Sequence, residues 1–242
     1  CVQGVEVPRR LLVMGLDRLC GAGRSRGELV DPVGRCSCGR LAALLAALRP
    51  GTGGVEAAAL VDLGAQLDPQ GAAELGIDLE RLLWLRPQNT GDSLAAAELL
   101  LHTGFPLVVL DLGLPPVRGR APLAAWLRLA RAAATHKATV LVGSPYRLSG
   151  CAAGAVVAGG RGRGNWSSGR ASRLLTGLRA RLYLSKRIGH PDLGEALTIL
   201  TLPGASFGPI APDSSSTDQK PEIRNPKSEI PTEERKNYVA AL

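Results

Sequence analysis

Long apolar runs, aromatic side chains and lysines are scarce in this 242-residue sequence. No apolar run approaches the roughly 20 residues that a membrane-spanning helix requires, so we expect no membrane span. The chain begins CVQGVEVPRRLL, without a starting Met and without the pattern of a secretory signal, which predicts a trimmed start and a cytoplasmic protein. Aromatic residues are only 3% of the chain, and we expect Trp84 and Trp126, which lie in apolar segments, to be core residues.

The cysteines and histidines form no recognisable disulfide or metal pattern. Five cysteines, an odd number, are spread over positions 1, 20, 36, 38 and 151, which argues against a disulfide framework. Cys36 and Cys38 form a C-x-C pair, but no second Cys or His pair follows at the spacing of zinc ligands. The three histidines, at 102, 136 and 190, are scattered along the chain. We therefore expect no metal site.

Positive charge is carried almost entirely by arginine. The formal net charge is +8, of which residues 1–210 carry +9 and residues 211–242 carry −1. Lys137 and Lys186 are the only lysines before residue 211. Such an excess suits a surface that binds an anionic partner such as nucleic acid. A GC-rich genome would also give many arginines, so composition leaves both explanations open.

The chain divides into a core and a tail. Residues 211–242 are rich in Pro, Ser, Lys and Glu, and KPEIRNP is echoed by KSEIPTE, which predicts a disordered polar tail. Residues 1–210 then form one core, with 1–26 as a short lead-in. Within the core, apolar periodicity predicts strands at 27–33, 57–63, 81–87, 105–113 and 138–146, and helices at 40–48, 69–77, 93–103 (with Asp92 or Ser93 near its N-cap) and 121–136.

This alternation predicts an α/β fold with a mostly parallel sheet and helices on both faces. FPLVVLDLG (105–113) is the strongest strand, because a continuous apolar run is typical of a strand buried on both faces. The later apolar runs at 180–188 and 197–203 are expected to be antiparallel strands at the C-terminal edge of the sheet.

GELVDPVGRCSCGRLAALLAAL (27–48) has the glycine spacing of a phosphate-binding loop, G-x-x-x-x-G-K-[ST]. Gly34 and Gly39 supply the two glycines, and Cys38 precedes the second one. The lysine is replaced by Arg40, a bulkier planar cation, and the metal-binding hydroxyl by Leu41, which cannot ligate a metal. The stretch therefore predicts either a degenerate nucleotide site or an ordinary strand-to-helix turn. Asp111, at the end of a later strand, is the candidate carboxylate for the metal's water shell.

Several segments, in order, resemble the RecA-type recombinase core. They are MGLDRLCGAGRSRGELVDPVG (14–34), ALVDLGAQLDPQGAAELGIDLERLLWLRP (59–87), VVLDLG (108–113), TVLVGSPYR (139–147) and LRARLYLSKRIG (178–189). The resemblance implies a RecA-like P-loop core over roughly 11–210. It also implies that a catalytic Glu should stand where this chain has Gly64, and a sensing Gln near Pro145 and Tyr146. Asp68 matches an Asp that contacts adenine in the family, so ATP or ADP is expected to bind weakly, if at all.

This loss of catalytic groups resembles the ImuA-type proteins, which are RecA-core relatives encoded with translesion polymerases. The role implied is that of a DNA-damage (SOS) accessory factor without ATPase activity, with a RecA-type recombinase or a translesion polymerase as its partner. Two alternatives stay open. One is a weakly active, recombinase-like ATPase completed by residues from a neighbouring subunit, and the other is a cell-division inhibitor of the SulA-like branch.

GAVVAGGRGRGNWSSGRASR (154–173) falls where the second DNA-binding loop of the RecA family would lie. Its arginines suit phosphates and Trp166 suits stacking on a base of single-stranded DNA. A surface loop with incidental arginines is the alternative. The shorter PPVRGRAP (115–122) stands in the place of the first loop. The candidate DNA-binding residues are Arg118, Arg120, Arg161, Arg163, Trp166 and Arg170.

Overall fold

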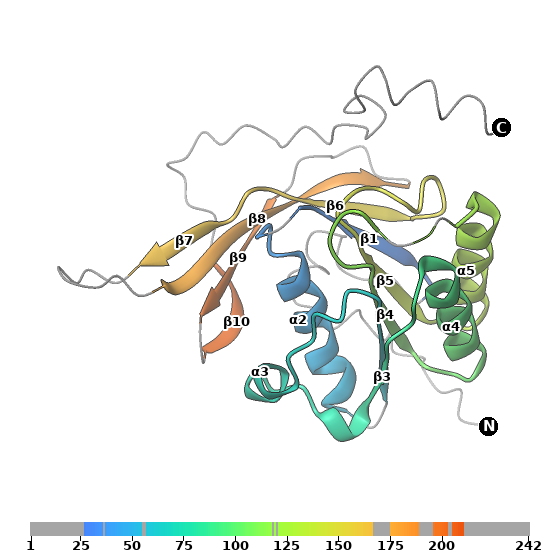
Figure 1. Cartoon of the computed structure of the whole chain (residues 1–242), viewed down its shortest axis with the longest axis horizontal. Helices are drawn as coiled ribbons and strands as arrows, with labels where there is room; N and C mark the ends of the chain where they lie inside the picture. Colours follow the sequence, from blue (N-terminus) through green and yellow to red (C-terminus); the bar gives the residue numbers. More distant parts are fainter. Residues whose placement is uncertain are drawn as a thin grey trace, which may run out of the picture.

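The computed structural model of the chain describes residues 27–35, 37–54, 57–117, 119, 121–166, 175–188, 196–202 and 205–210 (Figure 1). The predicted lead-in (1–26) and tail (211–242) lie outside these residues. Among the residues that are described, no helix combines the length and the apolar character that crossing a membrane requires.

Six strands of the sheet run parallel, in the spatial order β6-β1-β5-β4-β2-β3. Five of them confirm strands predicted from the sequence, each two to four residues shorter than the apolar stretch that indicated it. The strongest prediction, β4, is buried along four of its five residues. The bounds are β1 Leu29–Val33, β2 Ala58–Asp62, β3 Leu82–Leu85, β4 Leu107–Asp111, β5 Thr139–Gly143 and β6 Ala155–Gly159.

Four further strands extend the sheet antiparallel beyond β6, in the order β6-β8-β9-β10, with β7 paired to β8. Their bounds are β7 Arg163–Trp166, β8 Leu175–Arg187, β9 Ala196–Leu202 and β10 Ala205–Ile210. The predicted antiparallel strands at the C-terminal edge of the sheet are confirmed by β8 and β9, and β10, which the sequence did not predict, pairs outside β9. Much of the stretch taken as a Gly/Arg loop is also strand: AVVAG is β6, buried between β1 and β8.

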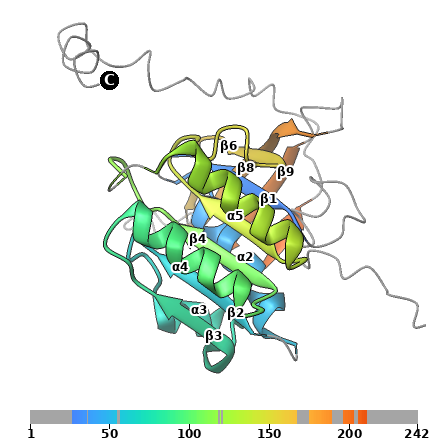
Figure 2. The same ribbon diagram turned by 90° about the vertical axis from the view of Figure 1, so that its right-hand side faces the viewer.

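Helices cover both faces of the parallel half. Helices α2 (Arg40–Thr52) and α3 (Pro69–Glu74) pack on one face, where Leu44 and Leu48 are fully buried. Helices α4 (Thr90–His102) and α5 (Leu123–Thr135) lie side by side on the other face (Figure 2). Trp126 of α5 is 2% exposed and belongs to that second core, as predicted. This arrangement puts the residues that follow the parallel strands at one edge of the sheet.

Helix α4 begins three residues earlier than predicted. Its N-cap is Asn89, whose side-chain oxygen accepts a hydrogen bond from the Asp92 N–H at 3.0 Å. The prediction of Asp92 or Ser93 as the cap was therefore wrong. Both residues lie inside the first turn, where the Ser93 hydroxyl donates to the Asn89 carbonyl at 2.8 Å. The apolar periodicity that located the helix begins only at Leu94, so it could not reveal this polar first turn.

Candidate functional site

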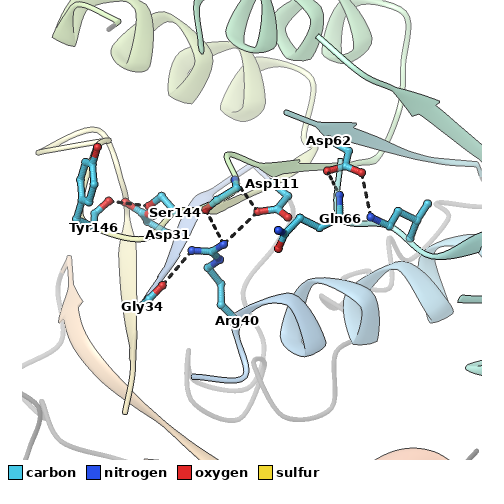
Figure 3. Close-up of polar contacts among 10 residues, drawn as sticks. Asp31, Gly34, Arg40, Asp62, Gln66, Asp111, Ser144 and Tyr146 are labelled. Atoms are coloured by element: carbon cyan, nitrogen blue, oxygen red, sulfur yellow. Dashed lines mark hydrogen bonds and ion pairs between the residues drawn. The ribbon is translucent and has the colours of Figure 1, made fainter. Parts of the chain in front are cut away.

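The predicted glycine loop lies between the carboxyl end of β1 and the start of α2 (Figure 3). The Gly34 N–H donates to the Ser144 carbonyl at 3.0 Å, which fastens the loop to the segment after β5. Gly39 adopts φ 81° and caps α2 without a side-chain hydrogen bond. A Cβ at Gly34 would overlap the Sγ of Cys38, a buried thiol that also packs against Gly159. Cys38 is thus a packing residue that fills the inner side of the loop.

Arg40, at the lysine position of the motif, turns its side chain into the protein and is only 5% exposed. Its Nη1 donates to the Gly34 carbonyl at 3.0 Å, and its Nη2 donates to the Gly113 carbonyl at 2.8 Å. The same Nη2 lies 3.5 Å from Oδ1 of Asp111 (Figure 3). The guanidinium therefore ties the loop to the end of β4, at the place where the motif would bring phosphate and metal together.

Asp111 is buried, and its surroundings act on its charge in opposite directions. Burial raises the pKa of Asp111, and the nearby Asp62 carboxylate raises it further. The Arg40 cation lowers the pKa, and so does the Gly113 N–H, which donates a hydrogen bond to Oδ1 at 3.0 Å. The Arg40 Nε and the Asp111 Oδ2 are buried without a hydrogen-bond partner. The expected metal carboxylate is thus engaged by an internal cation. The neighbouring Leu41, on the first turn of α2, offers no oxygen ligand.

The position of the missing catalytic Glu is closed by backbone. A Cβ built on Gly64 would lie 2.6 Å from the Gly113 Cα, and the converse distance from a Cβ on Gly113 to the Gly64 Cα is 2.8 Å. The two glycines therefore pack directly against each other. Asp62, two residues earlier, accepts hydrogen bonds at 3.1 Å from the N–H groups of Gln66 and Leu67 (Figure 3). It also accepts a hydrogen bond at 3.2 Å from the Trp84 indole. Asp62 therefore holds the turn after β2 and the edge strand β3.

We expect Gly64→Ala to lower the free energy of unfolding by about 1–3 kcal/mol, because the new methyl group would force the backbone at Gly113 to move. Gly54→Ala is the matched control, since no atom lies within 4 Å of a Cβ there. Urea unfolding of both variants measures the difference. Equal stabilities for the two variants would contradict the close packing of Gly64 on Gly113.

Asp31, in the middle of β1, was not identified from the sequence. Its carboxylate is fully buried and accepts a hydrogen bond from the Ser149 hydroxyl at 2.6 Å. It also lies 3.2 Å from the Ser144 Oγ (Figure 3). Burial raises its pKa to about 6, while the two serines and the nearby Arg147 oppose the rise. A charged residue inside an otherwise apolar strand was the available signal, because such a group requires polar partners.

The segment predicted to have lost the sensing glutamine is fixed by its own hydrogen bonds. Ser144 Oγ also lies 2.8 Å from the Tyr146 carbonyl, and the Tyr146 hydroxyl accepts from the Val117 N–H at 3.4 Å. Tyr146 therefore connects the end of β5 to the loop that follows β4. Asp68, the expected adenine contact, is the exposed N-cap of α3 and accepts from the Gln70 and Gly71 N–H groups at 3.2 and 3.1 Å. Both residues serve local structure here.

The candidate DNA-binding residues that are described lie on the β7–β8 hairpin, which extends from the sheet (Figure 1). Arg161 and Arg163 are exposed, and Trp166 is 55% exposed. Two arginines of β8 that the sequence analysis missed join them. Arg179 is the cross-strand partner of Arg163, and Arg181 follows two residues later. The candidates Arg118, Arg120 and Arg170 lie outside the described residues.

The hairpin begins beside the glycine loop. The Gly162 N–H donates to the Ser37 carbonyl at 2.8 Å. A Cβ on Gly39 would lie 2.9 Å from the Ala180 Cβ, so β8 packs closely on the last glycine of the loop. The degenerate loop and the arginine hairpin are therefore adjacent parts of one surface.

Comparison with known proteins finds similarity both in sequence and in structure. No protein-family model matches the chain. The Protein RecA of Picosynechococcus sp. is 36% identical over 99 residues, which are 40% of this chain and 28% of that protein, so the chain spans well under two thirds of this relative. The crystal structure of the RadB recombinase superposes with a TM-score of 0.56 and 17% identity, covering 76% of this chain and 92% of RadB. The chain has a RecA-like recombinase fold, as predicted.

Proposed function

We propose that this protein is a catalytically degenerate RecA-like protein that serves DNA repair as an accessory factor, through protein contacts and single-stranded DNA binding, without hydrolysing ATP. The observation that carries the proposal is the buried Arg40–Asp111 pair, which joins the glycine loop to the end of β4. A guanidinium there competes with a metal ion for the Asp111 carboxylate. The contact between Gly64 and Gly113 leaves no room for the base that would activate water.

The DNA-binding part of the proposal is supported by an uneven distribution of charge. Between Asp111 and Asp192 the sequence has no acidic residue but fourteen arginines and lysines. That stretch builds α5, β5, β6, β7 and β8, so the positive charge gathers in one half of the sheet. Arg163 and Arg179, paired across the hairpin, place two cations on one face of it. Phosphates favour such a face, and the exposed Trp166 offers a stacking surface for a base.

The accessory role and its partners are inferred from resemblance. The sequence resembles ImuA-type proteins in its loss of catalytic groups, and the RecA relative supports a role in DNA recombination or repair. On this proposal the protein works in the translesion branch of the SOS response and binds a RecA-type recombinase or a translesion polymerase. Those two proteins are the first partners to test by co-purification.

ATP turnover in the presence of single-stranded DNA tests the catalytic part of the proposal. We expect no phosphate release above the blank. The matched variant is Arg40→Met combined with Asp111→Asn, which removes both charges of the pair and leaves neither charge buried alone. If the natural chain hydrolyses ATP and the double variant does not, the alternative of an active ATPase is established.

Salt-dependent binding of a labelled oligothymidine tests the DNA part. We expect Trp166→Ala to weaken binding by about 1–3 kcal/mol. Replacing Arg163 and Arg179 together with Ala should flatten the slope of log K against log salt by about 1.4, since each phosphate contact to single-stranded DNA contributes about 0.7. The control is the double replacement of Arg128 and Arg131 on α5, which changes net charge equally. An identical slope for both double variants would remove the hairpin from the proposal, and absence of any binding would favour the SulA-like alternative.

A further inference from the structure

His102 and His136, which are far apart in the sequence, meet at the edge of the sheet opposite the glycine loop. His102 is the last residue of α4 and His136 is the C-cap of α5, immediately before the strands β4 and β5. The His136 Nε2 lies 3.0 Å from the His102 Nδ1, and the ring centroids are 4.7 Å apart in an edge-to-face arrangement. With strands of five residues, this edge lies about 17 Å from the loop edge. The pair is therefore separate from the candidate site.

The two facing ring nitrogens share one hydrogen bond, in which one nitrogen donates and the other accepts through its lone pair. At 3.0 Å one nitrogen must donate and the other accept, so the facing pair holds a single proton. A divalent metal ion can take the place of that proton when the donor ring moves the proton to its other nitrogen, so that both facing nitrogens offer a lone pair and both rings stay neutral, the form in which imidazole binds metals. Both residues are exposed, so water can reach the remaining coordination positions. No group of three potential ligands occurs among the described residues, so water would have to supply those positions.

The distance between the nitrogens fits a pair of adjacent metal ligands. With metal–nitrogen bonds of about 2.0–2.1 Å, two nitrogens at a right angle are about 3.0 Å apart, whereas tetrahedral ligands are about 3.4 Å apart. The observed 3.0 Å matches the right-angle arrangement of square-planar and octahedral ions, which Cu²⁺ and Ni²⁺ prefer. A small rotation of the two exposed rings would bring their lone pairs to a common point.

The surrounding backbone favours a cation at this place. The carboxyl ends of α4 and α5 converge here, and each helix C-terminus carries partial negative charge. Lys137, which follows His136, is the charged neighbour in the same turn and acts in the opposite direction. We propose that His102 and His136 form a two-histidine site for a divalent transition-metal ion, Cu²⁺ or Ni²⁺, bound through Nδ1 of His102 and Nε2 of His136 and completed by water.

Titration calorimetry of the full chain with Ni²⁺ tests the site. We expect one ion to bind per chain. Either His102→Gln or His136→Gln should weaken its binding at least about tenfold, because even the loss of a residue that only hydrogen-bonds to a metal ligand lowers metal affinity about 10–100-fold. Both rings are exposed, so these variants should fold normally, which the urea unfolding midpoint checks. His190→Gln is the control for loss of a histidine elsewhere and should leave the affinity unchanged.

A second measurement separates a bridging site from a single ligand. Ni²⁺ should raise the unfolding temperature of the natural chain and of His190→Gln, because the ion binds both helix ends only in the folded protein. It should not raise the unfolding temperature of either single variant at the same concentration. Absence of Ni²⁺ binding by the natural chain, or binding that both single variants retain in full, would overturn the proposal and leave a histidine–histidine hydrogen bond.

Discussion

Replacing Arg40 with Met is expected to lower the free energy of unfolding by about 3–5 kcal/mol at neutral pH, measured by urea unfolding. The reason is that Asp111, 1% exposed and close to Asp62, would remain buried without its cation. Acidification should reduce the loss. Burial already raises the pKa of Asp111, and removal of the cation would raise it further, so the carboxyl group becomes neutral at a higher pH and needs no compensation.

The double variant Arg40→Met/Asp111→Asn should recover most of that stability, because it leaves no uncompensated buried charge. Arg128→Met is the matched control: its partner Glu98 lies at 3.6 Å on the surface, where such pairs contribute about 1 kcal/mol or less. If Arg40→Met and Arg128→Met lowered the free energy of unfolding equally, the Arg40–Asp111 contact would contribute no more than an ion pair at the surface.

The stability of the natural chain should fall as the pH rises from 4 to 7, and Asp31 is expected to contribute about 3 kcal/mol of that fall. Its pKa is raised from 3.8 to about 6 in the folded protein, so the folded state holds the proton more tightly than the unfolded chain does. Protonation therefore stabilises the fold. The stabilisation is complete below pH 3.8, decreases as the pH rises to about 6, and is absent above that.

Asp31→Asn removes this dependence, since an amide keeps an acceptor for Ser144 without titrating. The stability of Asp31→Asn relative to the natural chain should therefore increase by about 3 kcal/mol between pH 4 and pH 7. Ser149→Ala is the second variant: it removes a bond of 2.6 Å that lowers the pKa, so the transition should move to higher pH. A stability difference between Asp31→Asn and the natural chain that does not vary with pH would contradict this account.

The single proton of the Ser144 hydroxyl limits how far Ser144 can oppose the effect of burial on the pKa of Asp31. Ser144 Oγ lies within hydrogen-bond distance of both the Asp31 carboxylate and the Tyr146 carbonyl, but it can donate to only one of them. A protonated Asp31 can donate to Ser144 and free the hydroxyl for Tyr146. With Asp31 protonated, the Ser144 hydroxyl can therefore donate to the Tyr146 carbonyl, whereas an ionised Asp31 competes for the same hydroxyl proton.

The parallel half of the fold could be predicted because its strands and helices have strong apolar periodicity. Where the periodicity stops, prediction failed. Strand β6 is only AVVAG, hidden in a glycine-rich stretch, and its identity as a strand depends on β1 and β8 on either side. Strand β7 is RGNW, with no apolar alternation, and is a strand only because β8 is long enough to pair with it. These strands depend on tertiary contacts that no local pattern encodes.

The motif located the glycine loop and Asp111 correctly at one edge of the sheet, since spacing fixes where a strand ends and a helix begins. It could not reveal that the Arg40 side chain turns inward, because the rotamer depends on the carbonyl of Gly113, which follows β4 and lies 73 residues further along the chain. His102 and His136 were described as scattered because only the parallel packing of α4 beside α5 brings them together.

The back-to-back contact of Gly64 and Gly113 excludes a larger side chain at residue 64. The first carbon of a glutamate side chain there would collide with the main chain of Gly113. Gly113 also offers its carbonyl to Arg40, so moving it would disturb the cation as well. A glutamate at residue 64 would thus require coordinated changes at several positions, because the same backbone segment both packs on Gly64 and holds the Arg40 side chain.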